Sequence, residues 1–256
     1  MWSMPTSRKS KNNVRMTKLL RFKNRLEAGK LLARRLGAYA HRGDVIVLAL
    51  PRGGVPVGFS VAQALQAPLD ILQVRKLGVP GHEECAMGAI ANGGLCVLQP
   101  EVLGALKIPR EMVEVLAQRK LREMALHEKL YRANRPALDV RQHVVILVDD
   151  GLATGSTMLA AVHVLRKGEP ARVIAAVPVA PRDVCRALRS EVDDMICLHT
   201  PVPFYSVGLW YEDFEQISDD EVKTLLDVAY REQAQGRQVL AADQAAKNRN
   251  QDARRH

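Results

Sequence analysis

Short apolar runs punctuate the chain at regular intervals. The runs at 45–50, 144–148 and 172–179 are apolar at nearly every position and rich in β-branched residues, and shorter ones lie at 69–74 and 195–198. A run that is apolar throughout is typical of a strand buried on both faces of a parallel sheet. The pattern therefore predicts several strands of one parallel sheet.

Helical periodicity separates these runs. Apolar spacings of three and four residues, together with start and stop residues, predict helices over 22–39, 57–65, 109–133, 156–168 and 181–188, and a last helix opening at Ser218. Residues 75–88 are rich in Gly, Pro and polar side chains and predict a long loop, and 89–98 predicts a hairpin that turns at 92–94. Alternating strands and helices predict an α/β fold: a doubly wound, mainly parallel sheet with helices on both faces.

Charge divides the chain into three parts. Residues 1–36 hold eleven Lys or Arg and one Glu, residues 231–256 hold six basic and three acidic residues, and the part between them is slightly acidic. The net charge of +9 therefore belongs to the ends. We expect a basic, mobile leader over 1–20, one domain over 21–230, and a polar tail without regular structure over 231–256. A basic arm can bind RNA or DNA, and the alternative is a solvated leader.

Composition excludes several classes of protein. An apolar fraction of 47% is ample for a core, and no run of about eighteen apolar residues indicates a membrane span. The four cysteines lie far apart without a C-x-x-C spacing, which indicates free thiols of a reducing compartment, so a cytoplasmic location is expected. Neither G-x-G-x-x-G nor G-x-x-x-x-G-K-[ST] occurs, which argues against dinucleotide and P-loop sites.

Val145–Thr157, reading VILVDDGLATGST, carries the main candidate chemistry. Asp149 and Asp150 follow a predicted strand, at the carboxyl end where open α/β sheets bind ligands. Glycines and hydroxyl residues then open a helix, whose N-terminus is suited to phosphate: Gly151, Thr154, Gly155, Ser156 and Thr157. Taken singly, these residues could merely cap a turn and a helix. Together, carboxylates beside a phosphate-binding loop indicate a ligand such as a phosphorylated ribose.

A second candidate loop, Leu50–Pro56, follows the first predicted strand. Arg52 is followed by Gly53 and Gly54, so the loop can offer a guanidinium and unobstructed backbone amides to an anion. The alternative is a tight turn with a solvent-facing Arg.

The 145–157 string resembles the 5-phosphoribosyl-1-pyrophosphate (PRPP) motif of the type I phosphoribosyltransferases. Residues 22–230 are similar to a bacterial group of phosphoribosyltransferases within that superfamily. The resemblance implies the type I fold with a small hood near 199–215. It also implies Mg²⁺-dependent transfer of 5-phosphoribose from PRPP to an acceptor, expected to be a nucleobase, with release of pyrophosphate. Mg²⁺ would be held mostly by PRPP oxygens and waters, and a homodimer would be ordinary.

The resemblance also implies a role for each candidate residue. Asp149 and Asp150 would hold the ribose hydroxyls and stabilise positive charge at C1. The 151–157 loop would bind the 5-phosphate, and Arg52, Gly53 and Gly54 the pyrophosphate. In the 75–94 segment, expected to close over the site, Arg75 would bind PRPP, and Arg75 or Lys76 would neutralise the departing pyrophosphate. His82, Glu83 and Glu84 of the same segment could serve as acid, base or metal-contacting groups. The acceptor would stack on aromatic residues of the hood: Tyr205, Trp210 and Tyr211.

Several alternatives remain open from the sequence, among them a phosphoribosyl hydrolase or a sugar-phosphate binding module without transfer activity. The aromatic residues could simply pack a small subdomain against the sheet. The protein could also be a regulator that keeps the same fold and senses PRPP or a nucleotide while its basic N-terminal arm binds RNA or DNA.

Overall fold

The computed structural model describes residues 21–80, 82–132 and 135–252, so the expected leader over 1–20 lies outside the described residues. The centre of the protein is a five-stranded sheet of order β2-β1-β6-β7-β8 in which all neighbouring strands are parallel. The strands are β1 (Val45–Ala49), β2 (Leu69–Ile71), β6 (Val144–Val148), β7 (Arg172–Val179) and β8 (Asp194–His199). These are the five apolar runs, so the prediction of a parallel sheet is confirmed.

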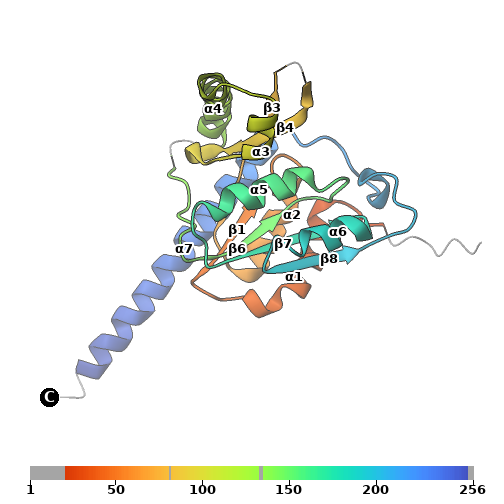
Figure 1. The fold of residues 1–256 in the computed structure, drawn as a ribbon. Coiled ribbons are helices and arrows are strands. Elements are labelled where there is room, and N and C mark those ends of the chain that lie inside the picture. Colours follow the sequence, from red (N-terminus) through yellow and green to blue (C-terminus); the bar gives the residue numbers. More distant parts are fainter. Residues whose placement is uncertain (1–20, 81, 133–134, 253–256) are drawn as a thin grey trace, which may run out of the picture.

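Helices cover both faces of this sheet (Figure 1). One face packs against α1 (Arg25–Arg35) and α2 (Gly54–Leu65), and the other against α5 (Ser156–Arg166) and α6 (Arg182–Leu188). Consecutive side chains of a strand point to opposite faces, so Ile146 packs toward α2 while Leu147 packs toward α5. This double burial explains why the runs are apolar throughout, and it confirms the doubly wound arrangement.

A smaller antiparallel sheet of order β3-β4-β5 follows β2 along the chain. It consists of β3 (Val74–Val79), β4 (His82–Ala91) and β5 (Cys96–Leu98), and is followed by α3 (Pro100–Ala105) and α4 (Arg110–Arg132). The prediction of a long loop over 75–88 is therefore wrong, and the hairpin over 89–98 is confirmed. Leu77 and Met87 bury their side chains against Val113 and Met124 of α4, a distant partner that the local Gly and Pro content does not reveal.

The last helix, α7 (Asp219–Asp252), begins where the sequence predicts. The Ser218 amide donates to Glu221 Oε2 at 2.8 Å and the Glu221 amide to Ser218 Oγ at 3.2 Å, which forms a capping box. The helix runs on to Asp252 and projects from the body of the protein (Figure 1), so the expected lack of regular structure is wrong for 231–252. Short 3₁₀ turns complete the fold: η1 (Gly37–Tyr39), η2 (Asn92–Gly94) and η3 (Gly208–Trp210). None of the helices in the described ranges combines the length and the apolar composition that a membrane crossing requires.

Candidate functional site

The order of the sheet brings the two candidate loops together. β1 and β6 are neighbours, with Ala49 opposite Val148, and the Leu50 amide donates to the Val148 carbonyl at 2.9 Å. The Arg52 loop therefore lies beside Asp149 and Asp150 at the carboxyl edge of the sheet. The peptide bond between Pro51 and Arg52 is cis.

Glycine is required in the Arg52 loop because the loop packs closely on the two acids. A Cβ on Gly53 would lie 2.0 Å from Asp150 Oδ2, and one on Gly54 would lie 2.8 Å from the Val148 carbonyl oxygen. The Gly54 amide donates to the Leu50 carbonyl at 3.1 Å. The two glycines thus allow the loop to approach the acids, and the Gly54 amide is already engaged within the loop.

Three other segments contact the segment of Asp150: the Arg52 loop, helix α1 and the segment 204–214. Asp150 Oδ2 accepts a hydrogen bond from Arg25 Nε of α1 at 2.7 Å, with the side chains only 9% and 15% exposed for Arg25 and Asp150 respectively. Arg25 also donates to the Glu215 carbonyl at 2.8 Å and lies 3.8 Å from the ring centre of Phe214. The Tyr211 hydroxyl donates to the Asp150 carbonyl at 2.6 Å. Arg25 is a site residue that the sequence did not predict: it is one of the eleven basic residues that we counted in the N-terminal segment.

Burial perturbs both acids. It raises the pKa of Asp149 well above the usual range, and repulsion from Asp150 raises it further. Burial also raises the pKa of Asp150, while the ion pair with Arg25 acts in the opposite direction. The Asp150 amide donates to Asp149 Oδ1 at 2.9 Å and partly satisfies that carboxylate. Within the part of the chain that the structure describes, no cation pairs directly with Asp149, so it is the acid better placed to gain from a ligand's hydroxyl groups or from a cation.

The predicted phosphate loop lies at the N-terminus of α5. Gly155 precedes the helix with φ of +73°, a left-handed conformation that favours glycine, and Ser156 is the first helical residue. The amides of the first turn suit an anion there, although the Ser156 amide donates a long hydrogen bond to Thr154 Oγ1 at 3.4 Å. The Thr154 and Ser156 hydroxyls lie 3.0 Å apart and Thr157 is exposed. The structure thus gathers the predicted phosphate ligands at one helix end.

Two cationic side chains approach from the small sheet. Lys76 Nζ donates to Ser156 Oγ at 2.8 Å, which places an ammonium group at the phosphate loop. Arg75 precedes it on β3 and donates to the Val74 carbonyl at 3.3 Å. Side chains of consecutive strand residues diverge, so the two cations serve different sides of β3. His82, at the start of β4, is exposed.

Arg52 belongs to a second polar cluster. Its Nη1 lies 3.7 Å from Asp219 Oδ1 at the start of α7, and the Tyr131 hydroxyl of α4 donates to the same oxygen. Burial raises the pKa of Tyr131, the Asp219 carboxylate raises it further, and Arg52 and Arg75 oppose the rise. Arg52, Asp219 and Tyr131 therefore form one polar cluster, although the sequence singled out neither Tyr131 nor Asp219 as a site residue.

The three aromatic candidates lie at different depths. Tyr205 is exposed, Trp210 is partly buried and Tyr211 is buried with its hydroxyl bound to Asp150. A Cβ on Gly151 would lie 2.5 Å from Val207 Cγ1, so this aromatic segment packs directly against the turn after the acids. The segment and the acids therefore form one site region.

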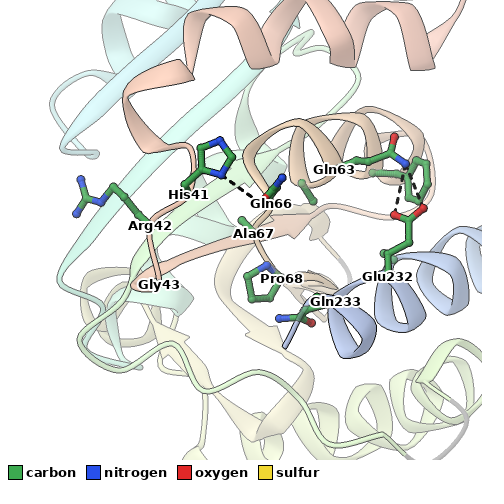
Figure 2. Close-up of a pocket in the computed structure, with 13 residues that line it drawn as sticks. His41, Arg42, Gly43, Gln63, Gln66, Ala67, Pro68, Glu232 and Gln233 are labelled. Atoms are coloured by element: carbon green, nitrogen blue, oxygen red, sulfur yellow. Dashed lines mark hydrogen bonds between the residues drawn. The ribbon is translucent and has the colours of Figure 1, made fainter. Parts of the chain in front are cut away.

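Two cavities differ in their relation to this region. One, of about 620 Å³, is shown in Figure 2 and lies between α2 and α7. Its residues His41–Gly43 and Gln66–Pro68 precede β1 and β2, so it lies at the amino edge of the sheet, away from the acids. The other, of about 460 Å³, is lined by Arg25, Pro56 and the first turns of α7. Through Arg25, this second cavity adjoins the site.

Comparison with known proteins identifies the fold family. Residues 17–206 match the phosphoribosyl transferase domain. The chain is 41% identical over 221 residues to the "Putative phosphoribosyl transferase" of Mycobacterium tuberculosis, in the strains CDC 1551 and H37Rv, and the match covers 86% of this chain and 50% of that protein. This chain thus spans half the length of those relatives.

A solved structure is similar over nearly its whole length. The crystal structure of TT1426 from Thermus thermophilus superposes with a TM-score of 0.72 at 38% identity, covering 80% of this chain and 97% of that one. The match includes the parallel sheet, and the family match includes both candidate loops. The chain belongs to the phosphoribosyl transferase domain family.

Proposed function

We propose that the protein transfers 5-phosphoribose from PRPP to an acceptor and releases pyrophosphate. The observation that supports this best is the pairing of β1 with β6, which places the Arg52 loop beside Asp149 and Asp150. PRPP carries a phosphate, ribose hydroxyls and a pyrophosphate. The α5 N-terminus, the paired acids and the Arg52 loop offer matching chemistry to these three parts in that order.

The 5-phosphate would bind at the 151–157 loop. Amides of the first turn of α5, the hydroxyls of Ser156 and Thr157, and the ammonium of Lys76 would all donate to its oxygens. Gly151, Thr154 and Gly155 give the loop its shape and its close approach. Pyrophosphate would lie toward Arg52, in the loop after β1, and Arg75 of β3, and Arg52 would exchange its contact with Asp219 for the ligand.

In the transfer, the bond from C1 of ribose to pyrophosphate breaks and its electron pair leaves with the pyrophosphate oxygen. The lone pair of an acceptor nitrogen then forms the new bond to C1, and the acceptor loses its proton to solvent. Asp149, once ionised, would stabilise the positive charge on the ribose ring between these events. Asp150, held by Arg25 and Tyr211, would fix the position of its neighbour.

Magnesium fits this site as a group brought in by the substrate. In the described ranges no three His, Cys, Asp or Glu side chains gather as a metal site, and Asp149 is the carboxylate that we assign to the ribose hydroxyls. When bound, Mg²⁺ would neutralise negative charge on the pyrophosphate.

The acceptor would bind between the acids and the 204–214 segment, with Tyr205 and Trp210 offering ring surfaces and Tyr211 closing the wall behind Asp150. A nucleobase is the acceptor that flat aromatic surfaces suit best.

Cys96, Cys185 and Cys197 are free thiols, which supports a reducing compartment such as the cytoplasm.

Incubation with PRPP, Mg²⁺ and a panel of purine and pyrimidine bases tests the proposal, with pyrophosphate release as the readout and Asp149→Asn as the control. We expect release that depends on one class of base and is lost in the control. Release that is independent of any acceptor would indicate a hydrolase instead, and no release with any base would reject the proposed transfer.

A further inference from the structure

Arg52, Tyr131 and Asp219 come from three elements that are far apart in the sequence. Arg52 lies in the loop after β1, Tyr131 near the end of α4, and Asp219 at the start of α7. The buried Tyr131 ring belongs to one apolar cluster with Val55 of α2 and Val222 of α7. Packing therefore holds the ring in place, and with it the hydroxyl that donates to Asp219 Oδ1.

A second contact fixes the end of α4 against α7. Arg135 Nη2 donates to the Tyr131 carbonyl at 3.0 Å and pairs with Asp227 of α7 at 2.9 Å. Tyr131 and Asp219 are thus tied to two helices that are joined to each other. Arg52 lies on a loop with a partly exposed side chain, so it is the member of the cluster that can move.

The contact between Arg52 and Asp219 is weak enough to be exchanged. Arg52 Nη1 lies 3.7 Å from Asp219 Oδ1, beyond the range of a direct hydrogen bond, and the two side chains are 38% and 34% exposed. Ion pairs of this exposure contribute little because water screens them. The same Oδ1 accepts from Tyr131, which leaves it a poorer acceptor for Arg52. Pyrophosphate offers several charged oxygens to the guanidinium and would form the stronger pair.

We propose that Asp219 competes with pyrophosphate for Arg52 and that Tyr131 weakens this competition. The role rests on the proposed function, in which Arg52 binds pyrophosphate. In the empty site Asp219 holds the guanidinium, pyrophosphate then takes it over, and Asp219 recaptures it as the pyrophosphate leaves. Asp219 is thus a positioning residue that acts through Arg52 and sets how tightly pyrophosphate is held.

Calorimetric titration of the full chain with inorganic pyrophosphate and Mg²⁺ tests this role. Asp219→Asn keeps the shape of the side chain but removes its charge, so we expect the dissociation constant to fall about two- to fivefold. Tyr131→Phe keeps the buried ring but frees Asp219 Oδ1 for Arg52, so the constant should rise. Damage to the fold would weaken binding in both variants, and urea denaturation checks that each is folded.

Two controls show whether the effect passes through Arg52. When Arg52→Gln is already present, Asp219→Asn should leave the dissociation constant unchanged, because there is no guanidinium left to compete for. Asp220→Asn removes an exposed charge from the same helical turn and should change the constant less than Asp219→Asn does.

Four results would overturn the role of Asp219 and leave the proposed transfer standing. They are weaker or unchanged binding by Asp219→Asn, binding by Tyr131→Phe as tight as in the wild type or tighter, an equal effect of Asp219→Asn without Arg52, and an equal effect of Asp220→Asn. A wild-type chain that binds neither pyrophosphate nor PRPP would reject the proposed transfer together with this role.

Discussion

The guanidinium of Arg25 reaches the carboxylate of Asp150 at 2.7 Å, although the two residues are 125 positions apart in the sequence. The contact joins the first helix to the end of the central strand. Because Asp150 follows Asp149 directly, the ion pair between Arg25 and Asp150 fixes the local backbone of both acids. The position of the acidic pair therefore depends on a helix that carries none of the predicted ligands.

Replacing Arg25 should destabilise the fold. Arg25→Gln leaves the Asp150 carboxylate buried without its partner, and we expect the free energy of unfolding to fall by about 3 kcal/mol in urea denaturation near neutral pH. The loss should shrink as pH falls, because protonation of Asp150 removes the unpaired charge. Arg42→Gln, at the exposed ion pair with Asp44, serves as the control and should leave the midpoint unchanged. Equal effects of the two variants would contradict the structural role of Arg25.

Gly53→Ala should damage the site through one methyl group. The added Cβ would lie 2.0 Å from Asp150 Oδ2, so the Arg52 loop or the acid must move. We expect a loss of about 1–3 kcal/mol in stability and a larger loss of pyrophosphate release. Gly43→Ala is the matched control, because nothing lies within 4 Å of its Cβ position. Full activity of Gly53→Ala would mean that the loop does not pack on the acids as described.

Asp149 should make stability depend on pH in the direction opposite to an ordinary ion-paired acid. Its pKa is raised in the folded protein, mainly by burial, so the stability that Asp149 contributes is full below its unfolded pKa and is lost as pH rises through its folded pKa. Asp149→Asn should therefore raise the melting temperature at neutral pH, and this advantage should disappear as pH falls below the unfolded pKa of about 4. The same substitution should abolish transfer. A lower melting temperature for Asp149→Asn at neutral pH would show that the charge is satisfied in the fold.

Lys76 should act through the phosphate loop. Lys76→Gln removes a cation that lies 2.8 Å from Ser156 Oγ, and pyrophosphate release at saturating acceptor should fall by about 100-fold. Lys167→Gln, an exposed lysine just past the end of the same helix, is the control. Equal rates for the two variants would remove Lys76 from the site.

Much of the site was predictable because its information is local. The strand before Asp149, the left-handed Gly155 and the helix start at Ser156 lie within a dozen residues, and each follows from the preference of its own segment. The same holds for the capping box at Ser218. The location of both candidate loops at the carboxyl edge of the sheet was predictable as well, since parallel strands bring their carboxyl ends to one edge.

The missing parts of the site depend on distant contacts. Arg25 in the sequence is one basic residue in a basic segment, and only the folded chain places it under Phe214 and against Asp150. Arg52 likewise meets Asp219 and Tyr131 from two other elements. Of the small sheet only the 89–98 hairpin was predicted; strand β3 and the first half of β4 were missed because Leu77 and Met87 find their apolar partners in α4, beyond the reach of local periodicity.

Calorimetric titration with PRPP and Mg²⁺ tests the central claim most directly, using the wild-type chain and Ser156→Asp. An acid at the first position of α5 is favourable for the helix, so this variant should fold normally while its charge repels the 5-phosphate. We predict that the wild-type protein binds PRPP and that Ser156→Asp does not. Absence of PRPP binding to the wild-type chain, or equal binding by the two proteins, would contradict the assignment of this site.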